Sequence, residues 1–255
     1  MLGFFNKIKK FNEFKAKNHA VIFSGALVFF AVLGLVPTAY LVSLCFALFN
    51  SHFSKTFEVF NFLEFLKIKD FLLETTNKLS TGGNLIAGFL SIYSSANLFF
   101  HLKLTGETIY NAKKTSKIFV RIFSIMGVIF LSLVVTFGVV TYAFFSVYIK
   151  KYLGEVLGTI INYSALFLLI FLAVLFINRF VCPYKIKLKN LLMGSVYTCV
   201  FSFLFTIVFI IYLKYFSSYD EIYGKIASIP AFLGWLFIVI RCLVTGIIIN
   251  AYLKD

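Results

Sequence analysis

Six long apolar stretches constrain this chain more than any other feature of its sequence. They cover roughly residues 20–49, 84–101, 118–149, 157–177, 191–213 and 229–253. A helix of about 20 mostly apolar residues crosses a hydrocarbon core about 30 Å thick. The first and third stretches exceed that length, so we expect them to tilt, kink or project from the bilayer. The predicted fold class is all-α, a polytopic membrane protein with six transmembrane helices in a single transmembrane domain over residues 1–255.

Composition excludes the other broad classes of protein. Hydrophobic residues make up 61% of the chain and charged residues only 13%, whereas a soluble domain has about 45–50% apolar and about 25% charged residues. Such a chain could not cover a surface that faces water, so a soluble globular enzyme is excluded. Disorder is excluded as well, because 35 Phe and 14 Tyr do not fit the aromatic-poor composition of disordered chains.

The net charge of +14 is explained by topology. Fifteen of the 24 basic residues fall on one side of the predicted membrane: before the first span, in the second connection with the start of the third span, in the fourth connection, and at Lys254. Eight fall on the other side, and Arg241 lies within the last span. Excess Lys and Arg marks the cytoplasmic side. Both termini are therefore predicted to be cytoplasmic, with anionic lipid headgroups as partners of the basic face and no nucleic-acid partner.

The first span is predicted to be an uncleaved anchor, because its apolar run far exceeds the core of a signal peptide. Metal and cofactor sites are not indicated, since no CxxC or Cys/His pairing occurs. The three histidines, His19, His52 and His101, are scattered along the chain. A metal-dependent nuclease needs clustered carboxylates or histidines, and no phosphate loop, nucleophile elbow or HExxH is present. We expect no metal, no cofactor and no enzymatic activity.

Two connections carry amphipathic patterns. The stretch Asn50–Gly83 combines four Lys and four acids with apolar residues three and four apart, which predicts short amphipathic helices at the outer interface. The stretch Thr105–Lys117 is a shorter version on the cytoplasmic side. These segments are either interfacial padding or a lid over a cavity.

The second span carries a stripe of small residues. Gly83, Ala87, Ser91 and Ser95 recur at every fourth position, and Asn84 lies on the same face. Such a stripe lets helices approach closely. The alternative is that Asn84, Ser91 and Ser95 line a hydrated or ligand-filled cavity.

Arg241 stands near the middle of the last span, where a charged side chain costs about 2.5–3.5 kcal/mol on insertion scales and usually marks function. No Asp or Glu occurs within the six spans. At 100° per residue, Thr245 and Tyr252 share its face with Pro230 and Gly234. These residues would suit a phosphate-bearing lipid. The alternative is that Thr245, Tyr252 and neighbouring carbonyls satisfy the guanidinium in a dry bundle.

An ordered set of residues resembles the YihY/BrkB family of bacterial inner-membrane proteins, once labelled ribonuclease BN-like. The resemblance covers nearly the whole chain. It implies six spans, an inner-membrane location and a link to envelope integrity or resistance to host killing. The family usually has Ala-Glu after the final glycine, where this chain has Ile247 and Ile248. The matching positions are Pro37, Arg179, Pro183, Gly194, Tyr223, Gly224, Trp235, Gly246 and Asn250.

Three classes of function follow. The first is a transporter or flippase-like protein for an anionic amphipathic envelope molecule, and the second is a structural or partner-binding membrane protein without transport. The third, a ribonuclease, has the least support. The sequence leaves the substrate, the energy coupling and the oligomeric state open.

Overall fold

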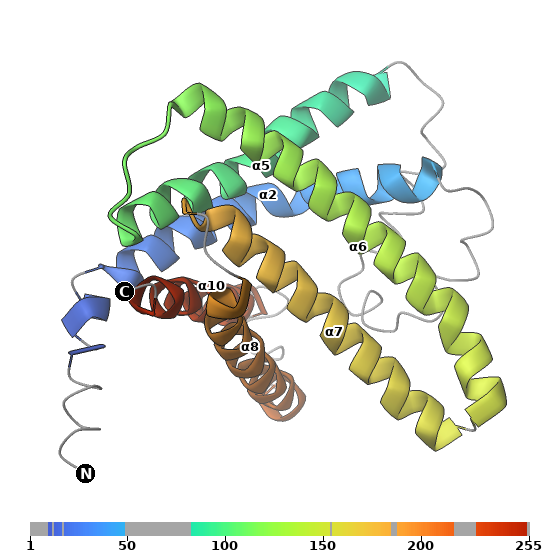
Figure 1. Ribbon diagram of the computed structural model, residues 1–255. Coiled ribbons are helices and arrows are strands. Elements are labelled where there is room, and N and C mark those ends of the chain that lie inside the picture. Colours follow the sequence, from blue (N-terminus) through green and yellow to red (C-terminus); the bar gives the residue numbers. More distant parts are fainter. Residues whose placement is uncertain are drawn as a thin grey trace, which may run out of the picture. The chain divides into compact units, whose positions relative to one another are not determined.

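The structure of the chain is a computed structural model that describes residues 10–11, 13–16, 18–48, 83–153, 155–184, 188–216 and 228–253. Within these residues the regular structure is entirely helical, which confirms the all-α prediction. Each predicted span corresponds to one long helix (Figure 1). The long helices are α2 (Ala20–Leu48), α5 (Gly83–Ile109), α6 (Lys117–Leu153), α7 (Glu155–Val181), α8 (Leu188–Phe216) and α10 (Ser228–Tyr252).

Four of the helices contain a stretch that is long and apolar enough to cross a membrane. These stretches, found among the described residues, are Lys117–Gly138, Tyr163–Val181, Leu188–Tyr212 and Pro230–Tyr252. Helix α2 contributes the shorter apolar stretch Ala20–Gly34. The chain is therefore a multi-pass helical membrane protein, and membrane spans in α2 and α5 stay predictions.

Large apolar side chains are exposed along successive turns of these helices. On α6 they include Ile118, Phe119, Ile122, Phe123 and Met126, each at least half exposed. A soluble protein rarely exposes a continuous apolar surface of this kind, because water around it is unfavourable. Hydrocarbon surroundings remove that cost, so the exposure pattern fits helices in a bilayer.

The contacts divide the chain into two compact units. One unit comprises residues 1–30, 101–114 and 174–255, and the other comprises residues 31–100 and 115–173. The boundaries fall inside α2, α5 and α7, so these three helices continue from one unit into the other. The single-domain prediction stays a prediction.

The structure corrects the prediction for Thr105–Lys117. Helix α5 does not end at His101 but continues to Ile109, so residues 105–109 extend the second predicted span. Two turn residues follow, Tyr110 and Asn111, with Asn111 in the left-handed region at φ 48°. Residues 112–116 then carry no regular structure, so no separate amphipathic helix forms here. The predicted amphipathic helices in Asn50–Gly83 lie outside the described residues, except that Gly83 begins α5.

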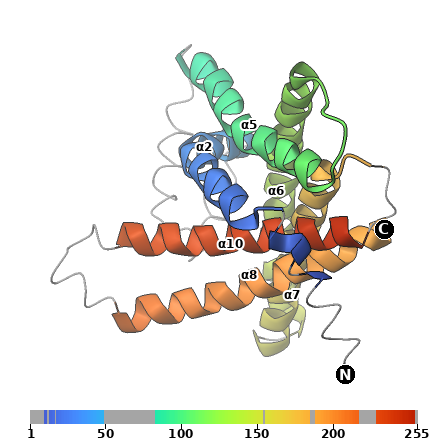
Figure 2. The same cartoon turned by 90° about the vertical axis from the view of Figure 1, so that its left-hand side faces the viewer.

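Helices α8 and α10 pack side by side as an antiparallel pair (Figure 2). Small side chains explain the close approach, since buried glycines, serines and threonines face each other along the pair. The buried apolar side chains of the two helices include Leu191, Val244, Ile247 and Ile248. This pair forms the centre of the first unit and positions the residues described next.

Candidate functional site

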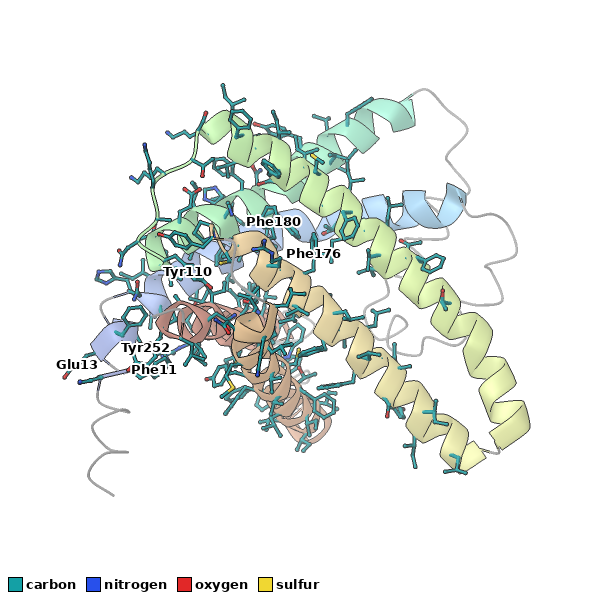
Figure 3. The ribbon with its side chains drawn as sticks, viewed as in Figure 1. Phe11, Glu13, Tyr110, Phe176, Phe180 and Tyr252 are labelled. Atoms are coloured by element: carbon teal, nitrogen blue, oxygen red, sulfur yellow. The ribbon has the colours of Figure 1, made fainter. Side chains whose placement is uncertain are left out.

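A short N-terminal segment, residues 10–18, lies against the end of α10. The ring of Tyr252 meets the ring of Phe11 edge-on at 5.6 Å between centroids and the ring of Phe14 at 5.5 Å (Figure 3). The backbone N–H and the Nδ2 of Asn18 both donate to the Phe14 carbonyl, at 3.2 and 2.9 Å. His19 follows in the left-handed region at φ 47°. This C-terminal cap reverses the chain into α2 and holds the segment on α10.

The basic residues Lys15 and Arg241 lie on this segment and on α10, respectively. Arg241 is exposed on α10, and Lys15 is half-buried. Burial, and then the positive charge of Arg241, lower the pKa of Lys15 from its usual value. Tyr197 of α8 and Cys242 lie within electrostatic range of the Arg241 guanidinium. From the sequence, Lys15 was identified only as a charge that sets topology. The signal that was missed is its position between Phe14 and Asn18, the two residues that anchor and end the segment.

Among the residues that the structure describes, neither Lys15 nor Arg241 forms an ion pair. Glu13, on the same segment, is exposed and lies on the outer side, away from Tyr252 (Figure 3). An anion could therefore pair with either basic side chain.

Thr245 and Tyr252 are the predicted hydroxyl partners of Arg241. Thr245 is only 3% exposed, and Tyr252 makes the ring contacts with the N-terminal segment. Within the described part of the chain, no hydrogen bond joins Arg241 to either residue. A shared site of these three residues stays a prediction.

The stripe on α5 lies partly on a packed face. Ser95 is 2% exposed and neighbours the fully buried Ala96, while Tyr93 on the other side of the helix is exposed. Ser91 is half-buried, and the side chain of Asn84 lies outside the described residues. The buried Ser95 Oγ makes no hydrogen bond to a described residue. Burial of this kind fits the packing interpretation of the stripe.

Three of the motif positions meet where α8 and α10 are closest. The backbone N–H of Gly194 donates to Oδ1 of Asn250 at 2.8 Å. A Cβ on Gly246 would lie 2.5 Å from the Gly194 carbonyl oxygen, so only glycine fits. Thr198 Oγ1 donates to the same Gly194 carbonyl at 2.8 Å. Asn250 is 1% exposed, and its Nδ2 has no hydrogen-bond partner among the described residues.

A third helix joins this contact. Asn178 of α7 donates from Nδ2 to Ser195 Oγ at 2.8 Å, and Ser195 Oγ lies 2.9 Å from the Leu191 carbonyl, to which it donates. Both Asn178 and Ser195 are buried. Ile248, at the position where the resembling family usually has an acid, is fully buried. An acidic side chain there would have to be neutralised or paired.

The other motif positions have structural contacts. Trp235 donates from Nε1 to Thr206 Oγ1 at 3.1 Å and stacks on Phe209. Arg179 donates to the Tyr184 carbonyl at 2.9 Å across the turn that contains Pro183. Pro37 lies inside α2 without ending it. Tyr223 and Gly224 lie outside the described residues.

Sequence reasoning missed the contacts of Lys103. Its ammonium donates to the carbonyls of Phe180, at 2.9 Å, and Cys182, at 3.4 Å, at the C-terminal end of α7. A cation suits this end of a helix, where carbonyls are otherwise unsatisfied. Burial lowers the pKa of Lys103, while Glu107 opposes that shift. The signal in the sequence was the Lys–Glu spacing of four residues, which places both on one face.

Tyr110 and His101 also have defined neighbours at this end of α5. Burial raises the pKa of Tyr110, and the nearby Cys182 adds to the increase. The ring of Tyr184 meets the Tyr110 ring edge-on at 6.3 Å between centroids. The ring of His101 stacks on the ring of Phe30 of α2, with 3.6 Å between centroids.

Arg121 was likewise counted only as a topology charge. Its guanidinium donates to Asn97 Oδ1 at 2.6 Å and lies 3.8 Å from the centroid of the Tyr93 ring. Cation–π contacts of this kind stabilise a charge in apolar surroundings. Arg121 therefore joins the start of α6 to α5 and is a structural cation, unlike Arg241.

These features define a class of protein, a multi-pass helical membrane protein whose last two long helices pack on a glycine contact and whose last helix carries an exposed arginine. The chain matches the model of the family described as Virulence factor BrkB over residues 11–255, and it belongs to that family. No curated protein and no solved structure matches it. The family resemblance inferred from the sequence is confirmed.

Proposed function

We propose that this chain binds and moves an anionic amphipathic molecule of the bacterial envelope, in the manner of a transporter or flippase. The observation that carries the proposal is the exposed Arg241 in the apolar stretch of α10, which forms no ion pair with a described residue. A charge in apolar surroundings is costly, and a bound anion offsets that cost. A guanidinium also presents a planar fork that suits phosphate or carboxylate oxygens.

The test is reconstitution of the parent and Arg241→Gln in vesicles that contain a fluorescent anionic lipid. We expect Arg241→Gln to be folded and inserted, to bind that lipid about tenfold more weakly, as for one charge-assisted hydrogen bond, and to lose its movement between leaflets. Arg241→Lys is expected to restore binding only in part, because the ammonium lacks the fork. Lipid binding and the rate of headgroup translocation are the measurements.

Lys114→Gln is the matched control, since it removes one positive charge from an exposed residue in the connection before α6. It is expected to bind and move the lipid as the parent does. The proposal is contradicted if Arg241→Leu keeps envelope function and lipid binding and melts no lower than the parent.

The second candidate is a structural or partner-binding membrane protein without transport. The observation in its favour is the use of Gly194, Gly246 and Asn250 for close packing of α8 and α10. If the described motif positions serve packing alone, Arg241→Leu should be neutral or stabilising, because it removes a charge from the membrane segment. The two candidates thus differ in the outcome for this variant.

We also propose that the chain resides in the bacterial inner membrane with both termini in the cytoplasm. The excess of basic residues on one side supports this orientation. Reporter fusions after Lys17, Lys113 and Lys187 are expected to be cytoplasmic, and those after Lys67 and Tyr219 external. An external reporter at Lys113 would contradict the six-span topology.

Absence of enzymatic activity and of a nucleic-acid partner is part of the same proposal. Anionic lipid headgroups are the proposed partners of the basic cytoplasmic face.

A further inference from the structure

We infer that Arg121, besides joining α6 to α5, is the centre of a binding site for an anionic phospholipid, with Lys117 as its second cation. The group that the two cations bind is the headgroup phosphate. This inference rests on the part of the proposed function that gives the basic cytoplasmic face lipid partners, and it does not depend on Arg241. The site lies at the start of α6, beside the contact of this helix with α5.

The guanidinium of Arg121 is held in place by uncharged groups only. It lies 3.8 Å from the centroid of the Tyr93 ring and 5.6 Å from that of the Phe100 ring. It donates to Asn97 Oδ1 at 2.6 Å and, at the longer distance of 3.5 Å, to the Tyr93 carbonyl. A guanidinium has five N–H donors, so these bonds leave donors for a further acceptor. Because the side chain is already ordered, binding of an anion costs little further conformational entropy.

Lys117 adds a second positive charge on the same side of α6. It begins the helix and is exposed, and residues four apart on a helix are neighbours on one face. Like charges at this spacing are unfavourable, and the first turn of α6 has no acidic residue that could offset them. Neither Lys117 nor Arg121 forms an ion pair with a described residue. An anion bound between the two side chains removes their repulsion.

The surroundings of Arg121 suit a lipid more than a free phosphate. The apolar stretch of α6 begins at Lys117, so Arg121 lies about one turn inside it, at the end of the span where a long basic side chain reaches the headgroups. Ile118, about one turn before Arg121, and Leu90, about one turn before Tyr93, are both exposed. Exposed apolar side chains beside a cation fit the acyl chains of a lipid whose phosphate the cation binds.

The experiment titrates purified full-length protein, in a neutral maltoside detergent, with short-chain phosphatidylglycerol. It is run on the parent and on Arg241→Gln, in which the site of the proposed function does not contribute. In the Arg241→Gln background, adding Arg121→Gln is expected to weaken binding about tenfold, as for one charge-assisted hydrogen bond. Adding Lys117→Gln should weaken it about threefold, as for an exposed ion pair. Phosphatidylcholine with the same chains should bind weakly throughout, because its headgroup has no net charge.

Lys189→Gln is the matched control for loss of charge, because Lys189 is also exposed in the first turn of a long helix, α8. It should leave binding unchanged. Tyr93→Leu keeps both charges but removes the ring that positions the guanidinium, so it should weaken binding about threefold, the strength of an exposed cation–π contact. Tyr163→Leu is its control, since Tyr163 is an exposed tyrosine of α7 with no described cation over its ring.

Thermal unfolding without lipid separates loss of binding from loss of the fold. Arg121→Gln also breaks the bond to Asn97, and it is therefore expected to unfold at a lower temperature than the parent. Lys117 makes no hydrogen bond to a described residue, so Lys117→Gln should unfold like the parent and still bind the lipid more weakly. The comparison of Lys117→Gln with Lys189→Gln thus tests the site even where Arg121→Gln is unstable.

The outcomes separate this inference from the proposed function. If Lys117→Gln and Lys189→Gln weaken binding equally, the basic face attracts lipid by net charge and the Arg121 site is wrong. If soluble glycerol 3-phosphate competes as well as the lipid does, the site binds a free phosphate ester and the lipid assignment is wrong. If Arg241→Gln alone binds like the parent while Arg121→Gln alone loses binding, the lipid site stands and the proposed role of Arg241 is wrong.

Discussion

Gly194→Ala and Gly246→Ala are each expected to lower the free energy of unfolding by about 1–3 kcal/mol, the usual cost of inserting a methyl group into a packed interior. The methyl group would meet backbone in both cases, because the Gly194 and Gly246 carbonyl oxygens are among the nearest atoms. Backbone at a helix contact cannot move aside as a flexible side chain can. The two helices must therefore separate, which also lengthens the bond from the Gly194 N–H to Asn250.

Thermal unfolding in detergent measures this effect. Gly234→Ala is the matched control on α10, because no atom lies within 4 Å of a Cβ at that position. It is expected to be neutral or stabilising, since Ala is about 1 kcal/mol more favourable than Gly in a helix. If Gly246→Ala unfolds at the same temperature as Gly234→Ala, the α8–α10 contact is looser than the structure has it.

Asn250→Asp is expected to destabilise the fold by several kcal/mol. The carboxylate keeps an oxygen that can accept from the Gly194 N–H, and the Asn250 Nδ2 that it replaces has no described partner. The substitution therefore changes little except the charge. Asn250 is almost completely buried, and the desolvation of an unpaired carboxylate costs several kcal/mol.

Asn190→Asp provides the control. Asn190 is exposed in the first turn of α8, where a negative charge is favourable. This variant is expected to unfold at or above the temperature of the parent. An Asn250→Asp protein as stable as Asn190→Asp would show that Asn250 is hydrated and that the contact is not dry. The measurement should be made near neutral pH, because a buried carboxyl group can also avoid the cost by staying protonated.

The helices and the family could be predicted from the sequence because their signals are local. Each span is a continuous apolar run, so its length and hydropathy identify it without knowledge of its neighbours. The ordered positions from Pro37 to Asn250 resemble the family, and the match over residues 11–255 confirms it. The end of α5 was missed because its signal is not local. Residues 102–109 look polar in sequence, yet Gly106 packs against Val181 and Lys103 donates to a carbonyl at the end of α7.

The candidate site could be predicted only in part. Arg241 was identified because a charge in an apolar run is unusual in any context. Periodicity placed Thr245 and Tyr252 on its face, but it could not show that Thr245 is buried or that Tyr252 is covered by Phe11 and Phe14. Helical periodicity gives the face on which a residue lies. The neighbour that covers that face depends on packing between helices.

The sequence by itself determined that this chain is a helical membrane protein of the BrkB family, since composition, apolar run length and motif order are properties of the chain alone. The tertiary structure decided which residues do what. It assigns Gly194, Gly246 and Asn250 to a close helix contact and Lys103 and Arg121 to structural bonds. It also places Phe11 and Phe14, far from Tyr252 in sequence, against its ring. The physical reason is that charge and hydrogen-bond partners depend on distances in space, which residues more than 200 positions apart acquire only on folding.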